Sequence, residues 1–185
     1  MVPQKRIDEA ATIVERFMIR WRGEPDPAHT KAVDAYFVSA AEHGMNASTF
    51  TARVIASTGA DAAACLSGAV GALSGPLHGG APSRVLKMLD EVAEEGDARR
   101  YVKRLLDSKQ RLMGFGHRVY RAEDPRARVL RRTAKELNAP RVEVAEALEN
   151  AALAELKERY PDRVLATNVE FWSAVVLDFA QVPAH

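Results

Sequence analysis

The sequence Gly75-Pro76-Leu77-His78-Gly79-Gly80-Ala81 holds a histidine between a proline and two glycines, directly after a stretch of small residues. Proline restricts φ and lacks a backbone donor, whereas the glycines permit positive φ and let a ligand approach the backbone closely. In this setting His78 can present an imidazole N–H group to a small ligand. The same stretch is also compatible with a plain helix stop that carries an incidental histidine.

Two further stretches place a histidine beside glycine: Glu42-His43-Gly44-Met45-Asn46-Ala47-Ser48-Thr49 upstream, and Met113-Gly114-Phe115-Gly116-His117-Arg118-Val119-Tyr120-Arg121 downstream. Asp124-Pro125-Arg126 follows the third histidine, and Asn168-Val169-Glu170-Phe171 lies near the end of the chain. A carboxylate and two histidines are residue types that can serve as a base for a carbon-bound proton and as donors to two carbonyl oxygens.

Composition indicates a globular protein. The chain has 185 residues, of which 47% are hydrophobic and 28% charged, enough for one good core or two small ones. The net charge of +1 gives no overall field that would attract nucleic acid or an anionic membrane. The single cysteine, Cys65, excludes an internal disulfide and is typical of a small buried residue in a reducing compartment. Because a signal-peptide pattern and a bilayer-spanning apolar run are both missing, we expect a cytoplasmic protein.

Hydrophobic spacing predicts helices throughout the chain and no convincing strand. Apolar residues recur every three or four positions over residues 4–21, which predicts one amphipathic helix. Ser48, Asp61 and Asp124 are expected to cap later helices, and Arg128, Arg131 and Arg132 to face water. Those helices are predicted at residues 28–40, 48–58, 62–74, 82–92 with a continuation over 98–106, 124–137, 141–159 and 168–179. The predicted fold class is therefore all-α.

The helix predicted at residues 62–74 consists almost entirely of small, uncharged side chains. A solvated helix would carry charges on one face, so this helix must be buried on nearly all sides. It lies either at the centre of a larger bundle or against a second subunit.

Taken together, the ordered motifs resemble those of the citrate synthase family, from the first helix to the last. The resemblance implies a multi-helical architecture in which residues 1–79 supply large-domain helices, residues 80–170 form the small domain and residues 171–185 return to the large domain. It favours a homodimer that pairs through the helix at 62–74. Family members have longer chains, so this chain is expected to be an internal piece of such an enzyme.

The resemblance also assigns roles in joining acetyl-CoA to oxaloacetate. Glu170 is implied as the base on the acetyl methyl group, His78 as the donor to the thioester oxygen, and His117 as donor and acid toward the oxaloacetate carbonyl. His43 is implied to help hold oxaloacetate. Arg126 is implied to bind a substrate carboxylate, which suits a planar guanidinium able to make two parallel hydrogen bonds.

Coenzyme A recognition is implied in the same way. Met113, Gly114, Phe115 and Gly116 match the loop whose backbone receives the adenine, and Arg121 matches a phosphate contact. The thioester is a substrate, and no tightly bound cofactor and no metal is implied. Two further oxaloacetate arginines would follow the last residue, so we expect the chain alone to have little or no synthase activity.

Glu170 departs from the family pattern, which has aspartate at this position. The additional methylene could displace the base by about an ångström, which can lower a rate on the order of a hundredfold.

Three other functions are compatible with these residues. A 2-methylcitrate synthase would use propionyl-CoA, and discriminating one methylene is worth only about 1–3 kcal/mol in an acyl pocket. A non-catalytic helical dimerisation module would need none of the chemistry. A transition-metal site is weakly supported, because the histidines are far apart and no close His pair or cysteine accompanies them.

Overall fold

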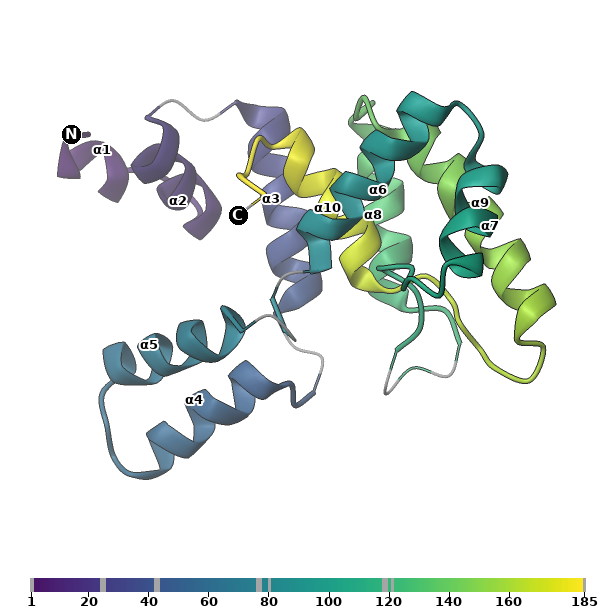
Figure 1. The fold of residues 1–185 in the computed structure, drawn as a ribbon. Helices are drawn as coiled ribbons and strands as arrows, with labels where there is room; N and C mark the ends of the chain where they lie inside the picture. The colour runs from purple at the N-terminus through teal and green to yellow at the C-terminus, as the bar shows by residue number, and fades with distance from the viewer. Residues whose placement is uncertain are drawn as a thin grey trace.

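The computed structural model describes residues 2–23, 26–41, 44–75, 78–79, 81–117, 120 and 122–184. Its secondary structure is helical, which confirms the all-α prediction (Figure 1). Within these ranges the only strand-like feature is an isolated antiparallel bridge between Phe115 and Thr167. The helices are α1 (Gln4–Asp8), α2 (Ile13–Arg22), α3 (Pro27–Ala40), α4 (Ala47–Ser57), α5 (Ala62–Leu73), α6 (Ala81–Glu95), α7 (Ala98–Asp107), α8 (Pro125–Glu136), α9 (Val142–Arg159) and α10 (Val169–Phe179).

The prediction of one helix over residues 4–21 is wrong, because the chain forms α1 and then α2. A capping box starts α2: the Thr12 side chain accepts a hydrogen bond from Glu15 N at 3.1 Å, and the Glu15 carboxylate accepts one from Thr12 N at 3.1 Å. This local signal begins a new helix inside the periodic pattern of apolar residues. Residues 9–12 separate the two helices.

Polar side chains start the later helices. Asp61 and Asp124 cap α5 and α8 as predicted, accepting hydrogen bonds from Ala64 N at 2.8 Å and Arg126 N at 3.0 Å. The prediction that Ser48 caps α4 is wrong. Asn46 holds that position and accepts a hydrogen bond from Thr49 N at 2.8 Å, so the helix begins before Ser48.

The hydrophobic core is centred on α10. All six residues from Phe171 to Val176 are buried, since α10 packs against α3, α6 and α8 (Figure 1). Helices α7 and α9 pack against each other beside this group. A helix that is apolar on every side needs such a central position. The start of α10, where Glu170 lies, is therefore held by three neighbouring helices.

Helices α4 and α5 form a hairpin that projects from the rest of the chain (Figure 1). No residue of either helix is buried, so α5 does not reach the burial predicted for it within this single chain, and Cys65 is only half-buried. A Cβ atom at Gly68 would overlap with Cδ1 of Ile55 on α4. The small residues of α5 thus serve its close approach to α4, while its outer face stays uncovered.

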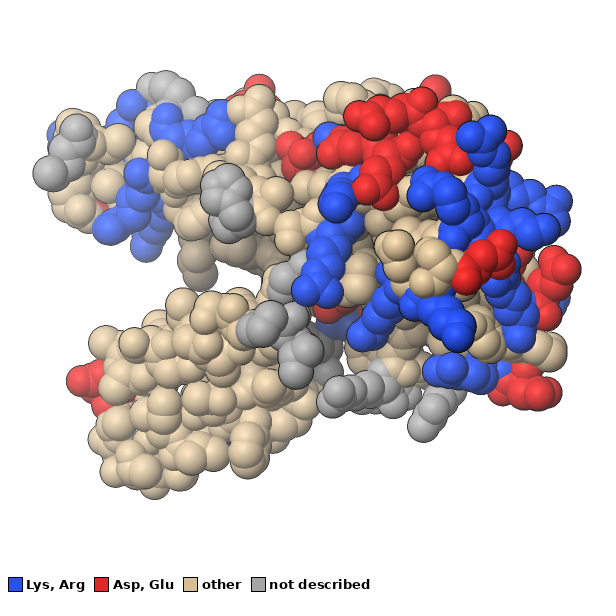
Figure 2. Space-filling view, viewed as in Figure 1, with Lys and Arg blue, Asp and Glu red and all other residues tan. Residues whose placement is uncertain are grey.

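Charged residues gather on the part of the molecule away from the hairpin (Figure 2). Of the three α8 arginines expected to face water, Arg128 and Arg132 do so. Arg131 does not, because it is partly buried and its Nε and Nη2 atoms donate hydrogen bonds to Glu146 Oε1 at 3.1 and 2.6 Å. None of the described helices has the length and apolar character needed to cross a membrane.

Candidate active site

His78 is held by the start of α4. Ser48 N donates a hydrogen bond to His78 Nε2 at 3.3 Å, and Ser48 Oγ lies 3.0 Å from the same nitrogen. Because Nε2 accepts, Nδ1 carries the proton of the neutral ring and can donate it to a ligand. Ser48 was expected only to cap a helix, and its contact with His78 joins residues far apart in the chain.

His117 contacts both Tyr120 and Arg126. Tyr120 N donates a hydrogen bond to His117 Nδ1 at 3.1 Å, so Nε2 carries the proton of the neutral ring. Nη2 of Arg126 lies 3.3 Å from that Nε2 atom. The imidazole and the guanidinium therefore present N–H groups side by side.

Arg126 is oriented by Asp124, which the sequence analysis treated only as a helix cap. Arg126 donates from Nε to Asp124 Oδ1 and from Nη2 to Oδ2, each at 2.9 Å, and the two residues are 7% and 1% exposed. Asp124 Oδ2 also accepts from Val169 N at 2.9 Å. Burial by itself raises the pKa of Asp124, but hydrogen bonds and charge from Arg126 outweigh it and hold the pKa below its ordinary value. Asp124 thus ties Arg126 to the start of α10.

The loop that contains Gly114 and Gly116 is attached to the residues before α10. Asn168 N donates to Gly114 O at 2.9 Å, Asn168 Nδ2 donates to Gly116 O at 2.8 Å, and Gly116 N donates to Ala166 O at 2.7 Å. The bonds of Gly114 and Gly116 on either side of Phe115 form the antiparallel bridge to Thr167. The N–H and C=O groups of Phe115 itself therefore point away from Thr167. A side chain at Gly114, where φ is +85°, would crowd Phe171.

Glu170 lies in the first turn of α10 with its carboxylate half-buried. Its backbone N–H donates to the cap Asn168 Oδ1 at 3.0 Å, which fixes the turn. Within the described part of the chain the carboxylate accepts no hydrogen bond and forms no ion pair. Burial raises its pKa, and the charges of Arg111, His78 and Arg126 lower it only in part. A partly desolvated carboxylate without a partner is suited to accept a proton.

The structure brings His78, His117, Arg126 and Glu170 into one constellation from four separate segments. Tyr36 of α3 belongs to it as well, since its pKa is raised by burial and it experiences the charges of Arg126 and Glu170. Sequence reasoning missed Tyr36 and Arg111, which no motif distinguishes. Two predicted site residues, His43 and Arg121, lie outside the described residues.

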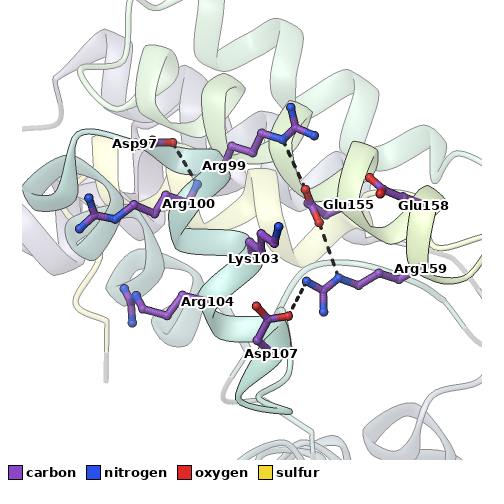
Figure 3. Close-up of a pocket in the computed structure, with 9 residues that line it drawn as sticks. All are labelled: Asp97, Arg99, Arg100, Lys103, Arg104, Asp107, Glu155, Glu158 and Arg159. Carbon is purple, nitrogen blue, oxygen red and sulfur yellow. Dashed lines mark hydrogen bonds and ion pairs between the residues drawn. The ribbon is translucent and has the colours of Figure 1, made fainter.

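A hollow of the described chain lies elsewhere. It measures about 620 Å³, lies between α7 and α9, and contains none of the constellation (Figure 3). Its charges largely pair with one another: Arg99 Nε lies 3.4 Å from Glu155 Oε1, and Arg159 Nη2 lies 2.7 Å from Asp107 Oδ1. We interpret this hollow as a solvated groove between ion pairs. The described residues contain no cluster of His, Cys, Asp or Glu that could hold a metal ion.

The constellation can be compared with known proteins. Residues 2–185 match the family model described as citrate synthase, C-terminal domain. The chain belongs to the citrate synthase family. It is 73% identical over 184 residues to a protein of Mycobacterium tuberculosis named putative citrate synthase 2, covering 100% of this chain and 49% of that one. The family resemblance drawn from the ordered motifs is thereby confirmed.

Solved citrate synthases share the fold. The enzyme from Thermotoga maritima is 36% identical with a TM-score of 0.80, covering 100% of this chain and 49% of its own. The enzyme from Thermoplasma acidophilum, solved in a ternary complex with carboxymethyl coenzyme A and oxaloacetate, is 27% identical with a TM-score of 0.81, covering 95% and 47%. The chain spans about half the length of the relatives it matches.

Proposed function

We propose that this chain carries catalytic groups of a citrate synthase, which condenses acetyl-CoA with oxaloacetate to give citrate and coenzyme A. The observation that carries the proposal is the unpaired, half-buried carboxylate of Glu170, whose pKa is raised by burial and is lowered only in part by the charge of Arg126. Such a carboxylate can remove a proton from carbon while fixed donors stabilise the oxygen that becomes negative.

The reaction divides among three side chains. Glu170 takes a proton from the acetyl methyl group while His78 Nδ1–H donates to the thioester oxygen, which gives the enol. The enol carbon then attacks the keto carbon of oxaloacetate, and His117 Nε2 gives its proton to the oxygen of that carbonyl. Water cleaves the citryl thioester and releases citrate and coenzyme A. Each donor role is supported by the hydrogen bond that engages the other ring nitrogen.

Oxaloacetate would meet the side-by-side N–H groups of His117 and Arg126. Asp124 occupies Nε and one Nη2 proton of Arg126, so the rest of the guanidinium is left for a substrate carboxylate. His43 would assist from outside the described residues.

Coenzyme A would approach the loop of residues 113–116. Hydrogen bonds within the chain occupy Gly114 O, Gly116 N and Gly116 O, whereas the backbone groups of Phe115 point away from Thr167. We therefore assign the adenine edge to the Phe115 backbone and the phosphates to Arg121. The large and small domains would be residues 1–79 and 80–170, with α10 leading back, and a cytoplasmic location fits the free Cys65.

An assay of thiol release from acetyl-CoA with oxaloacetate tests the proposal. We expect little or no turnover from these 185 residues and clear turnover from a version extended to the length of the relatives, because oxaloacetate carries two carboxylates and Arg126 serves only one. Propionyl-CoA in place of acetyl-CoA identifies a 2-methylcitrate synthase if it is the better substrate. Absence of coenzyme A binding and turnover in the extended protein would instead leave a dimerisation module.

We further propose that a second copy of the chain covers the α4–α5 hairpin. Phe50, Val54, Leu66, Val70 and Leu73 are large exposed apolar side chains of this hairpin. The face of the hairpin that Figure 2 shows is almost free of charged residues, and such a patch is typical of a subunit interface.

Light scattering at micromolar concentration should therefore report a dimer. The Leu66→Glu variant, which places a charge on the exposed face of α5, should shift the protein to monomer. The Ile13→Glu variant alters another exposed apolar residue, on α2, and serves as the control. A monomeric wild-type protein, or a dimer that Leu66→Glu leaves intact, would rule out this interface.

A further inference from the structure

A smaller hollow of about 210 Å³ lies beside Ala166 and Thr167, in the segment that leads into α10. Helices α8 and α9 form its walls, and the residues used below are Glu123, Arg128, Arg131, Glu149, Thr167 and Trp172. None of the proposed catalytic residues lines it. The hollow is below the roughly 300–1,000 Å³ of pockets for drug-sized ligands, so only a small molecule fits.

Two buried oxygens of the residues around this hollow have no hydrogen-bond partner in the described part of the chain. They are Thr167 Oγ1 and Glu149 Oε2, and both residues are only 5% exposed. Trp172 Nε1 donates to the other carboxylate oxygen, Glu149 Oε1, at 2.9 Å. Arg131 Nη1 lies 3.5 Å from Glu149 Oε2, so it supplies charge without a hydrogen bond. Buried polar groups are normally satisfied, so this wall favours a ligand that donates hydrogen bonds.

The charges around the hollow are balanced. Glu123 and Glu149 oppose Arg128 and Arg131, so a ligand with a net charge would gain little from the overall field. Arg128 is 69% exposed and pairs only loosely with Glu123, with Nη1 and Oε2 3.6 Å apart. Its guanidinium is therefore available to a carboxylate at the mouth.

We propose that this hollow binds a small α-amino acid. The ammonium group faces Glu149 and Thr167, the carboxylate meets Arg128, and an apolar side chain packs against Ala127 and Leu153. Thr167 lies between Ala166, which accepts from Gly116 N, and Asn168, which donates to Gly114 O. A bound amino acid thus rests on the segment that holds the glycine loop. The binding does not depend on the proposed catalytic function.

Isothermal titration of the purified chain with L-alanine and L-leucine tests this site. We expect saturable binding of at least one of them to the wild-type protein. Two probes that each lack one charged end of leucine, 4-methylpentanoate and 3-methylbutylamine, should bind on the order of tenfold more weakly or not at all. If 4-methylpentanoate or 3-methylbutylamine bound as tightly as leucine, the ligand would not need both charged ends and the amino-acid proposal would be wrong. If neither L-alanine nor L-leucine bound saturably, the site itself would be wrong.

Variants locate the binding. Arg128→Ala and Thr167→Val should each weaken it on the order of tenfold, and neither removes a hydrogen-bonding partner that the folded chain uses. Arg132→Ala is the matched control, because Arg132 lies on the same helix, is 72% exposed and does not line the hollow. Thermal melting checks that each variant is folded. Wild-type affinity in both Arg128→Ala and Thr167→Val would place any amino acid elsewhere and refute the proposal.

Discussion

Replacing Glu170 with glutamine in the extended enzyme should lower turnover by a factor of about 10² to 10⁴, because the amide cannot accept the proton from the acetyl methyl group. Thiol release from acetyl-CoA measures the loss. Glu170→Asp is the matched variant: it keeps a carboxylate and restores the shorter side chain of the family pattern, so it should retain far more turnover than Glu170→Gln. Near-normal turnover of Glu170→Gln would remove this residue from the mechanism.

The same carboxylate sets the direction of the pH dependence. Burial raises the pKa of Glu170, and the base must be ionised to act, so activity should fall on the acid side at a higher pH than for an ordinary glutamate. In Glu170→Gln the residual rate should no longer fall on the acid side at this pH. If the variant still lost activity at the same pH, the ionisation would belong to a residue other than Glu170.

Stability should move in the opposite direction to turnover in this variant. The pKa of Glu170 is higher in the folded protein than in the unfolded chain. Protonated Glu170 therefore stabilises the folded state fully below the ordinary glutamate pKa, and this stabilisation is lost as pH rises through the raised pKa. Glu170→Gln should therefore unfold at higher urea than wild type at neutral pH, and the two curves should converge in acid. A variant that is inactive because it is unfolded would show the reverse.

Replacing Asp124 with asparagine should lower the free energy of unfolding by about 3–5 kcal/mol, because it leaves the charge of Arg126 buried without its partner. The same change removes a hydrogen-bond acceptor of Val169 N at the start of α10. Urea unfolding at neutral pH measures the loss. Turnover of the extended enzyme should fall as well, because Arg126 and His117 lose their fixed positions.

A surface pair provides the comparison. Asp107→Asn breaks the ion pair with Arg159. The Asp107 side chain is largely exposed, so this change should alter the free energy of unfolding by about 1 kcal/mol or less.

The effect of Asp124→Asn should depend on pH, because the pKa of Asp124 is held below its ordinary value in the folded protein. The stabilisation that ionised Asp124 provides is complete above the ordinary pKa and is lost as pH falls through the lowered pKa. The difference between wild type and Asp124→Asn should accordingly shrink in strong acid. If Asp124→Asn were no more destabilising than Asp107→Asn, the buried pair would not be what holds α8 to α10.

Local signals were sufficient for most helix boundaries. Asp61 and Asp124 start helices because each side chain satisfies a backbone N–H a few residues away, an interaction that depends only on neighbouring residues. The missed break before Ile13 was also local, since Thr12 and Glu15 form a capping box that the hydrophobic spacing concealed. The motifs around His78, His117 and Glu170 were enough to identify the family.

Partners far apart in the chain could be assigned only from the tertiary structure. Ser48 orients the His78 ring, Asp124 accepts hydrogen bonds from Nε and Nη2 of Arg126, and the carboxylate of Glu170 has no partner among the described residues. The exposure of α5 likewise follows from packing, because its small residues allow α4 to approach on one side only. The sequence by itself determined the family and which residues are candidates for the chemistry, since their identities and local spacing do not depend on the rest of the fold. Which nitrogen donates, which charge is buried and which carboxylate stays free depend on long-range contacts, so the tertiary structure alone decided them.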